Sequence, residues 1–528
     1  MYKPLDIKQG VVSKYNTSLM PKEGINEEDF SQMMDMKYAK NIVNYIPHKF
    51  GLEKRKGLSK IFERAGANPI TLLKEFITNT WIFAYAEKVE SYNTSTSVFT
   101  TIKDDFSAND GFDGDRAGQY FLICNGVEKI WRITSTLGIS EIAASPICSG
   151  LKAIGARMYA FRLASNETAI QYSDVDDGTN PPFDDWAETT AADTGGSVNY
   201  RNAGPVRSVV QLGQFTVGFC DNGFFAWLIN VIDSAGTLKK VEVIQNYTED
   251  YGGARGAIET PFGIFYNNEA GMWQMVAVGQ TDVPMSKQQI LTSSLLKSDF
   301  FKDTDQTSSD LIYDINQRCI FLTIAKDSSF NNLVIGLKPE LKNAMFKIQN
   351  WNINRFAKLG TDIYGASSVK TTVYKLFDGY DDDGLKIGTE YYQEILLSTL
   401  LHAHSLDGIY AGGRLTPNDE LTVAFDIYDI NGNFVKDKTQ YLWTGTEASV
   451  DYDEWGSAMW GDSALGGGVD VAGIVNSFGG GSPRINNLQR LLVRITGGSK
   501  TPHILNWISV KTTQKQPIKR RNFTKITT

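Results

Sequence analysis

Short apolar runs separated by polar turns dominate the chain from about residue 66 onward. A typical group contains the runs Val206–Leu212, Phe215–Cys220 and Phe224–Val231, with the turns Gly213-Gln214 and Asp221-Asn222-Gly223 between them. Turns rich in Asn and Gly between such runs are a strong signal for β-hairpins. Each group therefore predicts three consecutive antiparallel strands.

Comparable groups recur through residues 66–393. Their runs are Phe76–Tyr85 and Ser97–Ile102; Gln119–Cys124 and Val127–Ile133, around the turn Asn125-Gly126; Arg157–Arg162 and Ala169–Tyr172; Gly256–Glu259, Gly263–Tyr266 and Met272–Val278; Leu311–Ile315, Arg318–Ile324 and Asn332–Leu337; Phe356–Leu359, Asp362–Tyr364 and Thr371–Phe377. A spacing of roughly 45–60 residues is typical of propeller blades. A propeller also leaves fewer bare strand edges than one or two β-sandwiches. We predict an all-β protein with a β-propeller of six or seven blades at 66–393.

Residues 1–65 have the most helix-like pattern. A short helix is expected at 27–36, with Asn26 as its N-cap, and the apolar spacing of Ala39–Tyr45 continues the helical pattern. The basic stretch Gly51–Leu58 is expected to be a solvated loop. This segment forms the first of three predicted parts of the chain.

Residues 394–528 are expected to form a C-terminal antiparallel β domain. Glu420–Tyr428 and the residues around Phe434 predict a hairpin, and further strands are expected at Tyr441–Thr444, Leu488–Thr496 and His503–Val510. The glycine-rich stretch that ends at Gly481 is expected to be a long surface loop. The basic end, 515–521, is expected to fray.

Composition supports a folded, strand-rich protein and argues against a DNA-coating one. Apolar residues make up 42%, charged residues 21% and aromatic residues 12%, with 48 glycines. The formal net charge is −8, and a protein that holds DNA needs a basic surface.

The cysteines lack metal-binding or paired spacing and are expected to be reduced and buried: they are Cys124, Cys148, Cys220 and Cys319. The start resembles no secretion signal and no run is long enough for a membrane helix, so we expect synthesis and assembly in a cytoplasm.

The candidates for metal binding are the four histidines and two acidic loops. They are His48, His402, His404 and His503; Asp104, Asp105, Asp110, Asp113 and Asp115; and Asp381, Asp382 and Asp383. His402 and His404 would share one face of a strand, but no carboxylate partner can be assigned to them. Neither loop has the spacing or the closing Glu of a calcium-binding EF-hand, and the segment from Asp426 to Gly432 fails the same test. We predict solvated acidic turns and no metal site.

The sequence favours a non-enzymatic protein without a cofactor. No G-x-S-x-G, Walker A, HExxH or GxGxxG motif has a strand–turn–helix context. Some propellers are sialidases, whose blades carry the turn Ser-x-Asp-x-Gly-x-Thr-Trp. The nearest segment, Ser173 to Asn180, keeps an Asp and a Gly but lacks correctly placed Ser, Thr and Trp. The two positioned carboxylates or the Tyr nucleophile of a glycosidase cannot be assembled, so no catalytic residue is assigned.

Motifs in three regions of the chain carry a resemblance to a known family. The opening region contains Asn41–Asn44 followed by Gly51–Leu58. The middle region contains two blade-like sets and the last region one closing set: Gly155–Phe161, Ile170–Asp174, Phe183 and Trp186; Val209–Gly213, Phe215–Phe219 and Asn222-Gly223; and Trp455–Gly461, Leu488–Ile495 and Ile504–Val510. These motifs resemble the tail nozzle, or tail tube, proteins of short-tailed bacteriophages, which include packaged-DNA stabilisation proteins, and the opening is similar to that family's "Asn … Gly … Lys-Arg-x-Gly-Leu". Together these motifs extend over most of the chain.

The resemblance implies a virion protein, a homohexameric ring below the portal and adaptor. Genomic DNA would pass through its lumen without specific binding, and its distal end would face the host cell envelope. Residues 1–65 would contact a neighbouring tail ring or platform, the propeller would dock tail fibres or spikes, and 394–528 would form part of the tube or platform. The loop Gly466–Gly481 would order on subunit contact or plug the lumen. The alternatives are a receptor- or glycan-binding propeller of a tail fibre or adhesin, and a cryptic hydrolase.

Overall fold

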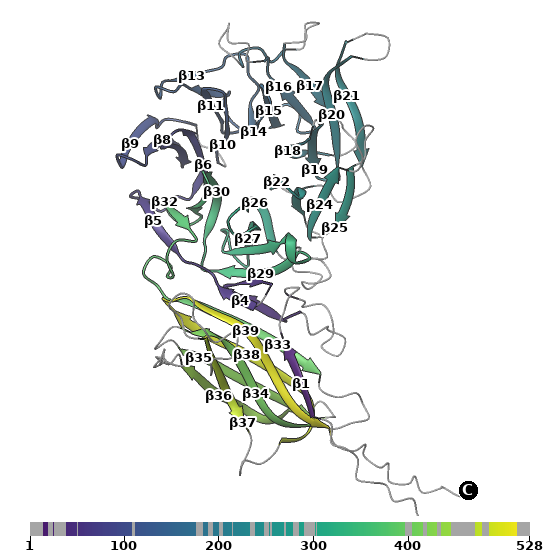
Figure 1. Ribbon diagram of the computed structural model, residues 1–528. Coiled ribbons are helices and arrows are strands. Elements are labelled where there is room, and N and C mark those ends of the chain that lie inside the picture. The colour runs from purple at the N-terminus through teal and green to yellow at the C-terminus, as the bar shows by residue number, and fades with distance from the viewer. Residues whose placement is uncertain are drawn as a thin grey trace, which may run out of the picture. The chain divides into compact units, whose positions relative to one another are not determined.

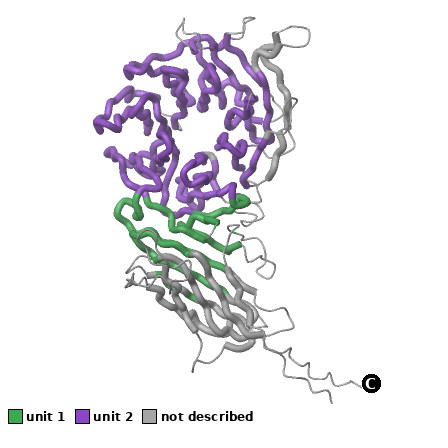
Figure 2. Tube along the Cα trace, viewed as in Figure 1, with its two compact units in different colours: residues 1–57, 341–347, 379–528 green, residues 58–340, 348–378 purple. Residues whose placement is uncertain are grey.

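The computed structural model divides the chain into two compact units, coloured separately in Figure 2. Unit 1 comprises residues 1–57, 341–347 and 379–528, and unit 2 comprises 58–340 and 348–378. The structure describes residues 14–19, 25, 38–49, 51–107, 111–175, 183–187, 194–199, 204–213, 215–232, 238–247, 253, 256–268, 271–277, 285–289, 301, 304–396, 404–415, 420–429, 434–444, 470–477 and 485–514. The description below refers to these residues.

Unit 2 consists of short strands. They are β5 (Leu58–Glu63), β6 (Ile70–Ile77), β7 (Thr80–Tyr85), β8 (Lys88–Asn93), β9 (Val98–Lys103), β10 (Asp113–Ala117), β11 (Tyr120–Cys124), β12 (Trp131–Ile133), β13 (Ile139–Glu141), β14 (Cys148–Ile154), β15 (Arg157–Leu163), β16 (Ala169–Tyr172), β17 (Gly196–Asn199), β18 (Val206–Leu212), β19 (Phe215–Cys220), β20 (Gly223–Ile232), β21 (Leu238–Tyr247), β22 (Ala257–Thr260), β23 (Gly263–Asn268), β24 (Gly271–Ala277), β25 (Met285–Gln289), β26 (Thr304–Asp314), β27 (Cys319–Lys326), β28 (Leu333–Lys338), β30 (Ile353–Leu359), β31 (Asp362–Ser367) and β32 (Thr372–Leu376). A single 3₁₀ turn, Pro339–Leu341, is the helical element described here.

These strands form small antiparallel sheets arranged as a closed ring (Figure 1). Five consecutive sheets contain β6–β9, β10–β13, β14–β17, β18–β21 and β22–β25; the next group contains β26–β28, and the last sheet contains β30–β32. The first strand of each group contacts the first strand of the next, and β30 contacts β6. The predicted all-β class is confirmed, and the ring has a β-propeller-like arrangement.

The last sheet takes its fourth strand from the start of unit 2. β5 pairs with β32 in an antiparallel register, with Leu58 opposite Leu376 and Glu63 opposite Thr372. The two ends of unit 2 are therefore held together by a strand ladder. Sequence patterns do not reveal such a pairing, because the two segments are more than 300 residues apart.

The hydrophobic clusters of unit 2 lie between consecutive sheets. One cluster joins Leu122 and Cys124 to Leu151 and Met158, from two neighbouring sheets. A central strand is covered on both faces, so its sequence is a continuous apolar run: all six residues of β7 are buried. The core positions that the apolar runs predicted are thus the packing surfaces between sheets.

Unit 1 contains longer strands. They are β1 (Lys14–Leu19), β2 (Asn41–Val43), β3 (Tyr45–His48), β4 (Gly51–Lys54), the start of β29 (Ala344–Gln349), β33 (Ile387–Leu396), β34 (His404–Leu415), β35 (Glu420–Asp429), β36 (Phe434–Thr444), β37 (Asp470–Ser477), β38 (Ile485–Ser499) and β39 (His503–Gln514). β38 pairs with β33, β34 and β35, and β39 pairs with β34, β1 and β4. The predicted hairpin is confirmed, because β35 pairs with β36 and Tyr428 lies opposite Phe434.

Three local predictions are wrong. The helical pattern of Ala39–Tyr45 gives way to strands β2 and β3, because Ile42 and Val43 pair with Tyr391 and Glu390 of β33. Tertiary pairing outweighs the local periodicity here. The predicted helix at 27–36 lies outside the described residues.

The second wrong prediction is the tight Asn125-Gly126 hairpin turn. β12 begins only at Trp131, and the Asn125 side-chain oxygen accepts the N–H groups of Val127 and Glu128, which makes a wider loop. The third is the surface loop Gly466–Gly481. Its middle forms strand β37, which pairs with β34 over Asp470–Ser477.

The compact units change along the chain at different positions from the predicted parts. The sequence pattern predicts changes at 65/66 and 393/394. The units change at 57/58 and 378/379, and the short segment 341–347 within unit 2 also belongs to unit 1. Two pairings account for the difference: β5 belongs to the last sheet of unit 2, and β33 pairs with β38 in unit 1. Residues 1–57 and 379–528 lie in the same unit.

Candidate functional site

A buried polar network in unit 1 contains the basic motif that the sequence predicts to be a solvated loop. Arg55 is 1% exposed, and its Nη1 and Nη2 atoms donate to the two carboxylate oxygens of Asp382 at 2.8 and 2.5 Å. Its Nε atom donates to Oδ1 of Asn44 at 2.8 Å. The prediction of a solvated turn is therefore wrong for Arg55 and for Asp382, because each provides the other's counter-charge.

Asn44 connects this ion pair to strand β33. Its backbone has a φ of 58°, a left-handed conformation that Asn tolerates better than most residues. Its Nδ2 atom donates to the carbonyl of Gly388 at 2.6 Å. The Asn side chain is thus used at both ends, as an acceptor from Arg55 and as a donor to β33.

Lys54 and Gly57, on either side of Arg55 in the sequence, have buried partners of their own. The Lys54 ammonium group is buried and donates to the carbonyls of Ser499 and Thr501 at 2.7 and 2.8 Å. Gly57 donates its N–H to the carbonyl of Gly379 at 3.0 Å, and a Cβ atom at this position would lie 1.6 Å from the carbonyl oxygen of Asp381. Only glycine fits here, because the obstructing atom belongs to the backbone.

Next to this network lies a buried histidine. A hydrogen bond of 2.8 Å joins the Tyr45 hydroxyl to Nε2 of His503. Burial, with a smaller contribution from the ammonium group of Lys54, lowers the pKa of His503 to about 3. Burial also raises the pKa of Tyr45. Both side chains are therefore neutral at physiological pH.

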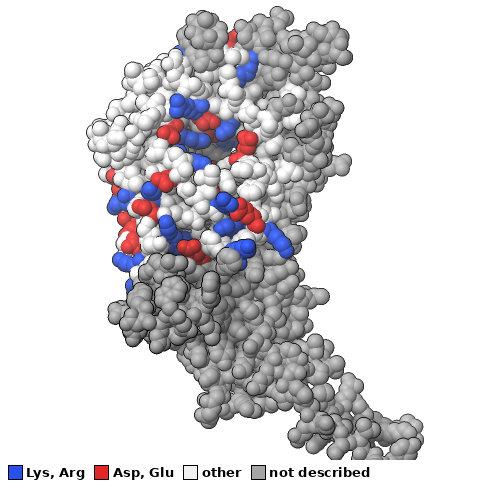
Figure 3. Space-filling model, viewed as in Figure 1, with Lys and Arg blue, Asp and Glu red and all other residues white. Residues whose placement is uncertain are grey.

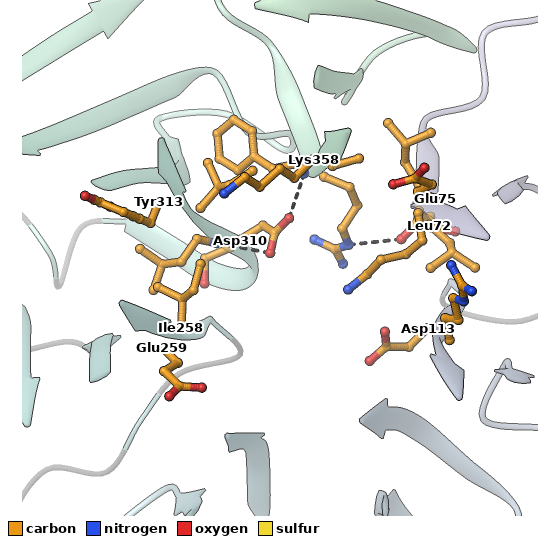
Figure 4. Close-up of a pocket in the computed structure, with 18 of the residues that line it drawn as sticks. Leu72, Glu75, Asp113, Ile258, Glu259, Asp310, Tyr313 and Lys358 are labelled. Atoms are coloured by element: carbon orange, nitrogen blue, oxygen red, sulfur yellow. Dashed lines mark hydrogen bonds between the residues drawn. The ribbon is translucent and has the colours of Figure 1, made fainter. Parts of the chain in front are cut away.

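Unit 2 contains a cavity of about 570 Å³ that is lined from all of its sheets. Six basic side chains line it: Lys74, Arg116, Arg162, Arg207, Arg355 and Lys358. Four acidic side chains line it as well: Glu75, Asp113, Glu259 and Asp310. Figure 3 shows charged side chains gathered around a hollow of unit 2, and Figure 4 shows Glu75, Asp113, Glu259, Asp310 and Lys358 around the cavity. The local balance is basic, although the whole chain carries −8.

Several of these cations are matched by nearby carboxylates. Arg162, which has a left-handed φ of 55°, lies 3.1 Å from Asp113. Arg207 donates through Nη2 to Asp221 at 2.6 Å. Lys74 lies 4.0 Å from Asp115, which raises the pKa of Lys74. Burial alone would raise the pKa of Asp115. The positive charges of Lys74 and Lys152 and two backbone N–H donors together outweigh burial, so the pKa of Asp115 is lowered.

Arg355 is held differently from the other cations. Its Nε atom donates to the carbonyl of Thr71 at 3.0 Å, and its Nη1 atom donates to the carbonyls of Ser308 and Asn354, both at 2.8 Å. These acceptors are neutral backbone oxygens. Burial lowers the pKa of Arg355, and the more distant carboxylate of Asp310 opposes this effect only in part.

Asp310 has its own backbone donors, which the dashed lines in Figure 4 mark. Its Oδ2 atom accepts the N–H of Phe356 at 2.7 Å, and its Oδ1 atom accepts the N–H of Leu311 at 3.0 Å. The carboxylate therefore fixes β26 against β30 instead of forming a close ion pair with Arg355. Within the described residues, no carboxylate oxygen lies within ion-pair distance of the Arg355 guanidinium group.

The remaining sequence candidates do not converge on a site. Asp113 and Asp115 lie on strand β10, so the prediction of a solvated turn is wrong for them, whereas Asp105 is exposed and paired with Lys103. His48 lies 3.2 Å from Glu53. Asp110, His402 and the part 176–182 of the sialidase-like segment lie outside the described residues, as do Trp455 and Trp460. Of His404, Asp426 and Asp429, only the backbone is described, on strands β34 and β35.

Among the residues that the structure describes, no group of three or more His, Cys, Asp or Glu side chains is arranged to hold a metal ion. In the same part of the chain, no helix has the length and apolar character to cross a membrane. The predicted burial of Cys124, Cys148, Cys220 and Cys319 is confirmed, and burial raises the pKa of Cys220 and of Cys319 to about 12.

The charged residues of the cavity were missed by the sequence reasoning, although a signal exists. A charged residue recurs at the spacing of the sheets, at positions 74, 116, 162, 207, 259, 310 and 355, which lie on β6, β10, β15, β18, β22, β26 and β30. In a ring of sheets, equivalent positions of the inner strands face the same central space. The recurrence of charge at this spacing is the pattern that would have identified the cavity.

Comparison with known proteins finds similar solved structures, of which two are described here. No protein-family model and no curated protein matches the chain. A chain in the crystal structure of the mitotic checkpoint complex is 12% identical with a TM-score of 0.41, and the similarity covers 61% of this chain and 93% of that one. The computationally designed Ika8 protein is 9% identical with a TM-score of 0.38, over 64% of this chain and 96% of that one. Neither likeness bears on what this chain does.

Proposed function

We propose that this chain is a structural, non-enzymatic component of the tail of a short-tailed bacteriophage, a nozzle or tube protein that forms a ring below the portal and adaptor. In this proposal, unit 2 is a seven-bladed β-propeller that presents docking surfaces for fibres or spikes. The C-terminal antiparallel β domain forms part of the tube or platform. Six copies surround a lumen through which the genome leaves without being bound specifically.

One observation carries the proposal. The residues of the opening motif that resemble the nozzle family, Asn44, Lys54, Arg55 and Gly57, are all buried. Arg55 bonds to Asn44 and Asp382, and Lys54 and Gly57 donate to the carbonyls of Tyr380 and Gly379, close to Asp382 in the sequence. A chance resemblance in a basic loop would leave such residues in solvent. Here each of these residues has a specific partner, so the motif has a structural role. Such a role would restrict which residues related proteins can have at these positions.

The charge of the chain supports the proposed passage of DNA. With a net charge of −8, the protein as a whole repels the phosphate backbone. A tube wall needs this property because a genome must slide past it without adhering. A DNA-holding protein would need the opposite balance.

Electron microscopy of the purified chain, alone and with the portal–adaptor assembly of the same genome, tests the proposal. We expect monomers or weak associations alone, and six-membered rings on the adaptor. An Asp382→Asn variant should fail to form stable rings, whereas the surface variant Glu340→Gln should form them. Trimers that carry bound sugar would instead support a receptor-binding protein, and a chain that never joins the adaptor would refute the proposal.

A further inference from the structure

Arg355 is a partly buried cation of unit 2 that has no close counter-charge among the described residues. Removing a guanidinium group from water is costly unless a carboxylate or another anion compensates it. Arg355 donates three hydrogen bonds, all to backbone carbonyl oxygens. Such bonds satisfy donors but do not neutralise the charge. The compensation is therefore incomplete in the protein by itself.

The guanidinium group also keeps donor capacity for a ligand. Its bonds to Thr71, Ser308 and Asn354 use Nε and Nη1, and Nη2 donates to no described residue. Nη1 and Nε are fixed by carbonyls of three different strands or their flanks, so the orientation of the group is set before any ligand binds. A preorganised donor loses little entropy on binding.

The surroundings of Arg355 suit a compact polar molecule. A volume of about 570 Å³ lies within the range of about 300–1,000 Å³ that is common for small-molecule sites. Lys358 is exposed on the same strand and lines the same cavity. Glu75 and Glu259 also line it and provide acceptors for hydroxyl groups. An anion alone would not use these acceptors, but a hydroxylated anion would.

We propose that the cavity of unit 2 binds a small hydroxylated molecule with one oxyanion, a carboxylate or a phosphate monoester, and that Arg355 receives the oxyanion. Lys358 adds long-range attraction at the rim, and the acidic side chains accept hydroxyl protons. This binding role goes beyond the proposed part in a phage tail and does not depend on it. It assigns a ligand to a cavity that a purely structural ring does not require.

Calorimetric titration of the full-length protein tests the proposal with three probes of similar size: D-glucuronate, D-glucose 6-phosphate and uncharged D-glucose. We expect at least one anion to bind with a Kd of about 1 mM or lower, at least tenfold more tightly than D-glucose. The anion that binds identifies the source of the oxyanion. If neither anion binds at least tenfold more tightly than D-glucose, the proposal is wrong.

Two variants and one control locate the site. Arg355→Gln should weaken binding of the preferred anion by about tenfold or more, the loss expected for a hydrogen bond to a charged group. Lys358→Gln should weaken it by about two- to fivefold, and because Lys358 is exposed this variant tests the site even if Arg355→Gln does not fold. Arg318→Gln removes an exposed arginine outside the cavity and should leave binding unchanged. The assignment would be overturned if Lys358→Gln and a folded Arg355→Gln both bound the anion as tightly as the unaltered protein, or if Arg318→Gln lost binding.

Discussion

Replacement of Asp382 by Asn tests the buried ion pair of unit 1. The Arg55 side chain is 0% exposed and that of Asp382 is 10% exposed, and two charge-assisted bonds join them. Asn keeps the shape of the side chain but removes its charge, so a buried guanidinium group loses its counter-charge. Breaking a buried pair in this way costs about 3–5 kcal/mol. We expect the free energy of unfolding of unit 1 to fall by about 3 kcal/mol, near the lower end of this range. Asn44 still accepts a hydrogen bond from Arg55, and one amide oxygen remains at position 382.

Hydrogen exchange of the amides in β33 and β38 provides the measurement. Two compact units can unfold separately, so a probe specific to unit 1 is needed for a meaningful free energy of unfolding. The matched control is Glu340→Gln, which breaks the exposed Arg318–Glu340 pair and should cost less than about 1 kcal/mol. The double variant Arg55→Met with Asp382→Asn should cost less than the sum of the two single changes. A loss in Asp382→Asn as small as in the control would refute the reasoning.

Three further predictions concern stability. His503 has a pKa of about 3 in the folded chain, against about 6.5 when unfolded, so the unfolded state binds more protons between these values. Unit 1 should therefore lose up to about 1.4 kcal/mol for each pH unit below about 6.5 in urea titrations; an unchanged slope in His503→Gln would contradict this. Phe62→Ala should destabilise unit 2 by about 3–5 kcal/mol in calorimetry, because Phe62 packs in the closing sheet; a negligible shift would argue against closure by β5. Gly57→Ala should lower the free energy of unfolding of unit 1 by about 2 kcal/mol or more, because the added Cβ would overlap the Asp381 carbonyl. The same change at Gly498, where space is open, should lower it much less. Equal losses in the two variants would contradict the steric argument.

The hairpins of unit 2 could be predicted from the sequence because their determinants are local. β18 and β19 have the predicted bounds, Val206–Leu212 and Phe215–Cys220, and the turn between them contains Gly213 with a left-handed φ of 59°. A turn that needs a left-handed residue favours glycine at that position. The glycine and the apolar runs on either side of it therefore predict the hairpin from a few neighbouring residues. The wider loop after Asn125 was not predicted, because an Asx turn and a two-residue hairpin turn can both have the sequence Asn-Gly.

The two polar sites could not be predicted in the same way, because their partners are distant in the sequence. A basic run such as Lys54-Arg55-Lys56 is usually solvated, and only the position of Asp382 in space makes Arg55 a core residue. For the cavity, no single strand contains enough charge to be recognised as a site. The resemblance to nozzle proteins did identify the opening motif, but it gave no physical reason for it. The reason is the network of Asn44, Arg55 and Asp382.

The closure of unit 2 also explains how so distant an ion pair can form. Arg55 and Asp382 are 327 residues apart, and closing a flexible loop of that length costs about 5 kcal/mol by the logarithmic length dependence. Once β5 has paired with β32, Leu58 lies opposite Leu376, and the loop that remains to be closed is only a few residues long. The packing of unit 2 has then already offset most of the entropy lost in closing the loop. Unit 2 should therefore fold first, and Phe62→Ala should slow the formation of unit 1 as well, although Phe62 itself lies in unit 2. Pulsed hydrogen exchange during refolding would show this order; protection of β33 before β32 would contradict it.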